Sequence, residues 1–174
     1  AGARRFLSAP DKNVRAALLY GPNRALVTEA AQQLVKHALG GTDDPFALTR
    51  LHEDELSKDK AKLSDALSAQ SLLGGPRVVW LKADGGTQSE AMVEALKIVD
   101  GDDGVFLVIE AGEFGTKGKT VASYETAPHA AAIAFYEESD AERAAFLKAL
   151  IDSERIPMSA DAREAWRAYC ARLA

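Results

Sequence analysis

The stretch from residue 14 to residue 39 constrains the fold most, because a short apolar segment, a tight turn and an amphipathic segment follow one another directly. Residues 16–20 are apolar without alternation, which is typical of a parallel strand covered on both faces. After Gly21-Pro22, apolar residues recur at helical spacing until Gly40-Gly41 ends the pattern. This order predicts the first strand, turn and helix of a nucleotide-binding α/β domain. The expected buried stripe of the helix comprises Leu26, Val27, Ala30, Ala31, Leu34, Val35, Ala38 and Leu39.

The turn of this unit lacks most of a phosphate-binding loop. Such a loop, G-x-x-x-x-G-K-[ST], wraps the phosphates with backbone N–H groups, balances their charge with a lysine and binds magnesium through a hydroxyl. Counted from Gly21, the second glycine position holds Leu26, the lysine position Val27 and the hydroxyl position Thr28. The sequence therefore predicts a degenerate loop that does not bind a nucleoside triphosphate. Taken alone, the pattern also fits an ordinary α/β unit that never bound nucleotide.

Strand and helix patterns alternate along the first three quarters of the chain. Further strands are expected at residues 46–51, 77–81, 105–109 and 130–136. Helices are expected at 58–70 and after a capping box at 87–90, with a short, weak helix between 112 and 126. Five alternations predict a parallel five-stranded sheet with helices on both faces. The most apolar strand, 105–109, should lie centrally.

From residue 139 onwards the pattern is helical only, which places a domain boundary near Glu137. A second capping box at 139–142 and a start signal at 157–159 each predict a helix, the latter carrying Trp166 and Tyr169. We expect an α/β domain over 1–136 and a small helical domain over 137–174. The chain begins without Met and ends inside a helical pattern, which suggests a fragment of a longer protein.

The composition is that of a globular protein and excludes several classes. A net charge of −5 argues against strong autonomous binding to nucleic acid, because that affinity rests on Lys and Arg. Cys170 is the one cysteine, which excludes an internal disulfide, fits a cytoplasmic location and favours a structural thiol. No apolar run reaches the roughly 20 residues that span a bilayer.

Signals for catalysis or metal binding are weak. A serine nucleophile elbow is missing, and the strand at 77–81 is followed by Lys82-Ala83, with Asp84 too late to handle magnesium. We therefore expect no catalytic residue and no cofactor. The histidines lie in unrelated segments without ligand spacing, which argues against a metal site; they are His37, His52 and His129.

The run at 70–79, QSLLGGPRVV, resembles the Q-S-L-F-G-G-R-R-V-V segment of the delta subunit of bacterial DNA polymerase III, the clamp-loader wrench. Other segments agree in order and spacing: LLYGP at 18–22, DPF at 44–46, VIEAGE at 108–113 and AAAIAFY at 130–136. The resemblance covers most of the chain and implies a AAA+ fold, in which an α/β domain precedes a helical lid, here incomplete. It further implies a non-catalytic subunit that binds and opens the sliding clamp during DNA replication.

Carried over by position, Leu72 and Leu73 match the exposed hydrophobic pair that enters the clamp, with Ser71 ahead of them. Leu73 stands where Phe is common, which makes the wedge smaller. The implied partners are the sliding clamp (beta subunit) and the loader subunits gamma/tau and delta prime, with DNA only in the full assembly. From the pattern alone, two leucines turned into the core are the commoner outcome.

Two other functions stay open at this stage. A divergent P-loop ATPase or nucleotide kinase would need an unusual phosphate site near Gly21, Arg24 and Thr28. An unrelated α/β scaffold would need neither nucleotide nor clamp. Titration with Mg-ATP and a pull-down with the sliding clamp separate the three hypotheses.

Overall fold

A computed structural model of the chain describes residues 6–7, 10–40, 46–70, 74–83, 89–101, 104–113, 118–136, 151 and 159–171. The chain divides into two compact units, Ala1–Phe135 and Tyr136–Ala174. We describe each unit by itself. The interpretation of the second unit as an incomplete lid stays a prediction.

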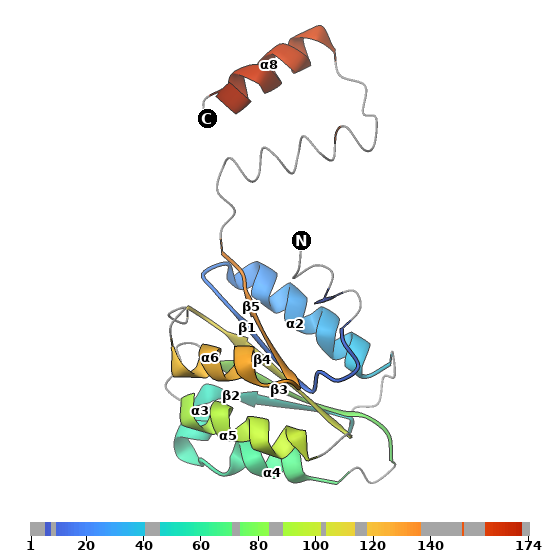
Figure 1. Cartoon of the computed structure of the whole chain (residues 1–174), viewed down its shortest axis with the longest axis vertical. Helices are drawn as coiled ribbons and strands as arrows, with labels where there is room; N and C mark the ends of the chain where they lie inside the picture. The colour runs from blue at the N-terminus through green and yellow to red at the C-terminus, as the bar shows by residue number, and fades with distance from the viewer. Residues whose placement is uncertain are drawn as a thin grey trace. The chain divides into compact units, whose positions relative to one another are not determined.

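The first unit is built on a five-stranded parallel sheet, as the sequence predicts (Figure 1). The strand order is β2-β3-β4-β1-β5, and each neighbouring pair runs parallel. The most apolar strand, β4, lies at the centre, which confirms its predicted place. The strands are β1 (Ala16–Tyr20), β2 (Leu48–His52), β3 (Arg77–Ala83), β4 (Val105–Ala111) and β5 (Ala130–Ala134).

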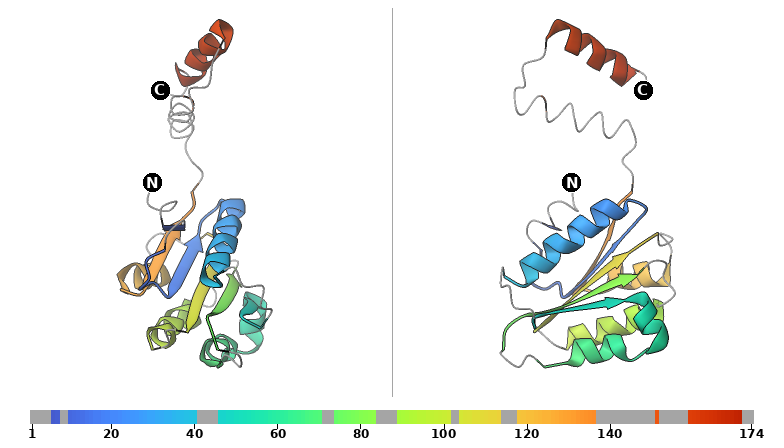
Figure 2. Two further views of the ribbon diagram at one scale, coloured as in Figure 1. Left: turned by 90° about the vertical axis from the view of Figure 1, so that its right-hand side faces the viewer. Right: turned by 180° about the vertical axis from the view of Figure 1, so that it is seen from behind.

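Helices cover both faces of this sheet (Figure 2). Helix α2 (Arg24–Ala38) packs on one face, where it buries residues that include Val27, Leu34 and Val35. Helices α5 (Ser89–Asp100) and α6 (Lys119–Thr126) cover the other face, together with the shorter α3 (Glu53–Lys58) and α4 (Lys62–Ser68). The apolar strands are therefore buried from both sides, as expected for a parallel sheet.

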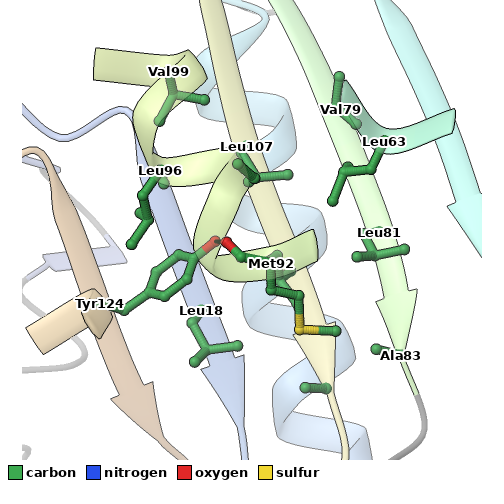
Figure 3. Packing of buried hydrophobic residues seen from close by; sticks show 14 of the residues in the cluster. Leu18, Leu63, Val79, Leu81, Ala83, Met92, Leu96, Val99, Leu107 and Tyr124 are labelled. Carbon is green, nitrogen blue, oxygen red and sulfur yellow. Dashed lines mark hydrogen bonds between the residues drawn. The ribbon is translucent and has the colours of Figure 1, made fainter. Parts of the chain in front are cut away.

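The core on the α5 side contains a buried tyrosine between helices and sheet (Figure 3). Tyr124 of α6 lies beside Leu96 of α5 and Leu18 of β1, and its hydroxyl donates to the Met92 carbonyl oxygen at 2.9 Å. Burial raises the pKa of the Tyr124 hydroxyl, because the phenolate would lose its hydration. This hydrogen bond connects α6 to α5.

The sequence prediction is wrong about the segment between β2 and β3. One helix was expected over 58–70, but α3 starts at Glu53 and a break separates it from α4. The Glu55 carboxylate accepts from the His52 N–H at 3.0 Å, which starts α3 as a capping box. The chain is extended at Asp59, whose carboxylate accepts from the Ala61 N–H, so the helix cannot continue.

Several element boundaries also differ from the prediction. Strand β2 starts two residues later than expected, and Phe46 ahead of it is 83% exposed. Strands β3 and β4 each run two residues further than predicted, whereas β5 ends at Ala134. Leu26 was expected in the buried stripe of α2 but is 41% exposed. Gly40 ends that helix with φ +61°, as the glycine pair predicts.

The second unit contains helix α8 (Ala160–Ala171), which carries Trp166 as predicted. The Ser159 hydroxyl accepts from the Ala162 N–H at 3.2 Å, so the serine caps the helix start. Both capping boxes predicted from sequence involve residues outside the described ranges, namely 87–88 and 139–142. Cys170 lies in α8, but its side chain is outside the description, and its structural role stays a prediction. Within the described ranges, no helix combines the length and apolar character that crossing a membrane requires.

Candidate functional site

The first site to consider is the turn between β1 and α2, where a nucleotide-binding domain would hold phosphate. Helix α2 starts at Arg24, so three residues, 21–23, separate it from β1. The Asn23 carboxamide oxygen accepts from the Leu26 N–H at 3.2 Å and caps the helix. Leu26, Val27 and Thr28 consequently lie within the helix. The segment that wraps the phosphates in a P-loop is here largely a helical turn.

The N–H groups of this turn are engaged within the chain. Gly21 N–H donates to the Gly112 carbonyl at 3.0 Å, and Asn23 N–H donates to the Phe135 carbonyl at 3.3 Å. Val27 N–H donates to the Asn23 carbonyl at 3.0 Å, and Pro22 has no N–H to offer. A phosphate would have to displace these bonds before it could receive the same donors.

Gly21 is the one glycine that remains of the P-loop pattern, and the backbone at this position requires glycine whether or not phosphate binds. Its φ is +138°, and a Cβ at this position would lie 2.2 Å from the Phe135 carbonyl oxygen. Glycine therefore allows the chain beyond β5 to pass close to the turn. Val27, at the lysine position, is 1% exposed and packs between α2 and the sheet, so it supplies no charge to the turn.

Thr28, at the hydroxyl position, donates a hydrogen bond to Glu110 of β4. Its Oγ1 lies 2.6 Å from Glu110 Oε1. The other carboxylate oxygen, Oε2, accepts from the Trp80 indole N–H at 3.1 Å and lies 3.4 Å from the Lys82 ammonium. Glu110 is 5% exposed, so this buried carboxylate is satisfied from three sides. We call Thr28, Trp80, Lys82 and Glu110 the Glu110 cluster.

A hydroxyl beside a carboxylate is also the pairing that a magnesium site uses. Here both carboxylate oxygens already have donors, and the Lys82 ammonium supplies the positive charge that a metal would bring. Glu110 was not predicted from the sequence, where the acid of such a site was expected after the strand at 77–81. That strand runs to Ala83, so Asp84 follows it directly, but Asp84 is outside the described residues. The signal in the sequence that could have identified Glu110 is that it is the one charged residue in the apolar run of β4.

The predicted clamp-binding residues, Ser71, Leu72 and Leu73, lie outside the described residues. Their described neighbours on both sides, Ala69-Gln70 and 74–76, are exposed. Gly74 and Gly75 have φ of +70° and +99°, in the region that favours glycine. The described residues on both sides of the segment therefore lie at the surface of the domain.

The connection from α4 to β3 is tied together at its base by Arg77, the first residue of β3. The guanidinium donates to the Ala66 carbonyl at 3.2 Å and to the Leu67 carbonyl at 3.1 Å. These carbonyls belong to the last turn of α4, where helical partners run out.

The histidines do not come together. His129 approaches the Leu96 carbonyl at 2.9 Å through Nε2 and the Asp100 carboxylate at 3.1 Å through Nδ1, both of them on α5. His37 lies on α2, and His52 is the last residue of β2. In the part of the chain that the structure describes, no three His, Cys, Asp or Glu side chains form a group suited to a metal ion. A pocket of about 230 Å³ lies at the amino ends of β1, β3 and β4, lined in part by Arg15, Arg77 and Phe106. The degenerate loop is at the opposite, carboxyl ends.

The parallel sheet, its strand order and its two helical layers define an α/β domain with a AAA+-like fold. No protein-family model and no curated protein sequence matches the chain. Among solved structures, the Bacillus subtilis DNA clamp loader delta protein (YqeN) matches with a TM-score of 0.63 and 16% identity, over 88% of this chain and 47% of that one. The structure thus resembles part of that delta protein in fold, and the chain spans about half of its length.

Two other solved structures are similar at lower scores. Caenorhabditis elegans PCH-2 has a TM-score of 0.46 and 16% identity, over 91% of this chain and 46% of that one. Domain III of the Thermotoga maritima replication initiation protein DnaA has a TM-score of 0.48 and 7% identity, over 92% of this chain and 70% of that one.

Proposed function

We propose that this chain is part of a clamp-loader delta subunit, which binds and opens the sliding clamp in DNA replication without hydrolysing ATP itself. Two independent likenesses support the proposal. The run at 70–79 resembles the delta-subunit segment in sequence, and the fold resembles the Bacillus subtilis delta protein at a TM-score of 0.63. At 16% identity, the structural likeness supports only the fold. The function is therefore our proposal.

The observation that carries the proposal is that the turn after β1, where a nucleotide-binding domain holds phosphate, has its N–H groups hydrogen-bonded within the chain. N–H groups of Gly21, Asn23 and Val27 donate within the chain, and Thr28 donates to Glu110. A triphosphate would have to break these bonds before it could bind at the turn. A subunit built in this way works through protein contacts and leaves hydrolysis to partner subunits.

The proposed contact with the clamp is made by Leu72 and Leu73, with Ser71 ahead of them. Burying one leucine side chain contributes about 1.5–3 kcal/mol, which is enough for a binding hot spot. The exposed positions of Gln70 and Gly74 on either side support this assignment. Leucine at position 73 fills less volume than the phenylalanine common in the family.

The further partners follow from the same proposal. Gamma/tau and delta prime would complete the loader, and DNA would be contacted only within that assembly. The net charge of −5 supports DNA contact only within the assembly, since an isolated acidic domain attracts nucleic acid poorly. The work would take place in the cytoplasm.

The test is the affinity of the chain for the sliding clamp of the same organism, measured by surface plasmon resonance. The double variant Leu72→Ala/Leu73→Ala should bind at least about 100-fold more weakly, because two buried leucines contribute about 3 kcal/mol or more. Leu26→Ala removes a leucine that is 41% exposed on α2 and serves as the matched control. Unchanged clamp affinity in the double variant contradicts the assignment. A large fall in its thermal midpoint would instead identify the two leucines as core residues.

Calorimetric titration with Mg-ATP tests the other half of the proposal. We expect no binding at micromolar nucleotide. Micromolar affinity would favour the divergent P-loop ATPase or nucleotide kinase, with phosphate near Gly21, Arg24 and Thr28. A chain that binds neither nucleotide nor clamp would be an unrelated α/β scaffold.

A further inference from the structure

The side chain of Arg77 joins the two ends of the connection that carries the proposed clamp contact. This connection runs from Ala69, just after α4, to Pro76, just before β3. Arg77 is half-buried, and its two terminal nitrogens donate separately to the carbonyls of Ala66 and Leu67. The guanidinium therefore fixes the end of α4 against the start of β3.

The backbone of the connection is constrained at the same two ends. At Ala69 the chain becomes extended, with φ −60° and ψ +140°, which ends α4. Gly74 and Gly75 then both adopt positive φ, and a Cβ on either would meet nothing within 4 Å. Glycine is needed there for its backbone conformation and not for lack of space.

We propose that Arg77 is a positioning residue for clamp binding, which fixes the described ends of the connection, 69–70 and 74–76, before the clamp arrives. This inference rests on the proposed function, because it assigns a role to Arg77 in that same contact. A connection whose ends are already fixed loses less conformational freedom when it binds. Arg77 acts through the connection and does not need to touch the clamp, since its guanidinium is used within the domain.

Arginine suits this role better than lysine. Its planar, forked guanidinium donates to two carbonyls at once, and its charge favours the carboxyl end of a helix. Lysine retains the charge and the flexible stem but not the fork. Arg77→Lys therefore tests the fork separately from the charge, and Arg77→Ala removes both.

The experiment measures association and dissociation rates of the chain on the immobilised clamp. When fewer free molecules have the binding-competent conformation, the apparent Kd rises in inverse proportion. If that fraction falls to about a tenth in Arg77→Ala, Kd rises about tenfold through a slower association rate. Arg77→Lys should show the same change to a smaller extent. The matched control, Arg50→Ala, removes an exposed arginine from the neighbouring strand β2 with the same change of net charge.

A second measurement needs no clamp. Hydrogen exchange of the Ala69, Gln70, Gly74 and Gly75 amides should be faster in Arg77→Ala than in the wild type, while β4 is unchanged. Wild-type association and exchange rates in both Arg77 variants would overturn the positioning role. So would an affinity loss confined to the dissociation rate, as a direct contact gives. Absence of clamp binding by the wild type would overturn the proposed function, and the exchange data would still decide whether Arg77 orders the two ends of the connection.

Discussion

The hydroxyl of Thr28 should stabilise the domain, because it satisfies a buried carboxylate. Thr28→Val replaces the hydroxyl with a methyl group of similar size, so the packing is largely kept. The lost bond is short, 2.6 Å from Oγ1 to Glu110 Oε1, and Glu110 is 5% exposed. Hydrogen bonds to charged groups contribute about 1.5–3 kcal/mol. We expect the free energy of unfolding to fall by that amount.

The assay is urea unfolding followed by circular dichroism, with Thr28→Ser as the control. Serine retains the hydroxyl and loses one methyl group, so it should stay within about 1 kcal/mol of the wild type. In a Glu110→Gln background, Thr28→Val should cost less, since its acceptor is then uncharged. A Thr28→Val variant as stable as the wild type, with Thr28→Ser the less stable of the two, would show that this hydrogen bond does not stabilise the domain.

Two further predictions concern residues around the sheet. Gly21→Ala should destabilise the domain by roughly 1–3 kcal/mol or more in thermal unfolding, because its Cβ would lie 2.2 Å from the Phe135 carbonyl oxygen and its φ is +138°; an unchanged midpoint would contradict this. Burial raises the pKa of Tyr124 in the folded state, so above a pH of about 10 the unfolded chain releases this proton while the folded chain keeps it. The free energy of unfolding should therefore fall as pH rises above about 10. Tyr124→Phe should reduce that slope in unfolding measured from pH 9 to 11. It should also cost about 0.5–1.5 kcal/mol at neutral pH, because the hydrogen bond to the Met92 carbonyl is lost; an equal slope in both proteins would contradict the assignment.

Most of the sheet could be predicted from the sequence, since apolar runs such as 105–109 have few other uses in a globular chain. The break at Asp59 could not, because it depends on a local hydrogen bond from the Ala61 N–H that competes with the helix. The exposure of Leu26 could not be predicted from the helical pattern either. This leucine lies on the apolar side of the helical pattern, yet it is 41% exposed and does not belong to the core on that face, whereas Val27, the next residue, is buried there.

The candidate site was predicted in part. The spacing from Gly21 predicts which phosphate-binding residues are missing, but it gives no information on what the turn does with its N–H groups. Those partners, Gly112 and Phe135, are distant in sequence and come together only through the strand order. Glu110 was missed for the same reason, because its partners Thr28 and Trp80 lie 82 and 30 residues away. The role of Arg77 could not be predicted either, because it depends on the carbonyls at the end of α4 to which its guanidinium donates.

The central proposal is that this domain works through protein contacts and not by binding nucleotide. The most direct test is the Kd of the chain for the sliding clamp, measured with no nucleotide and again with millimolar Mg-ATP. We expect binding in both conditions with the same Kd. Binding that requires Mg-ATP, or that Mg-ATP tightens severalfold, would contradict it.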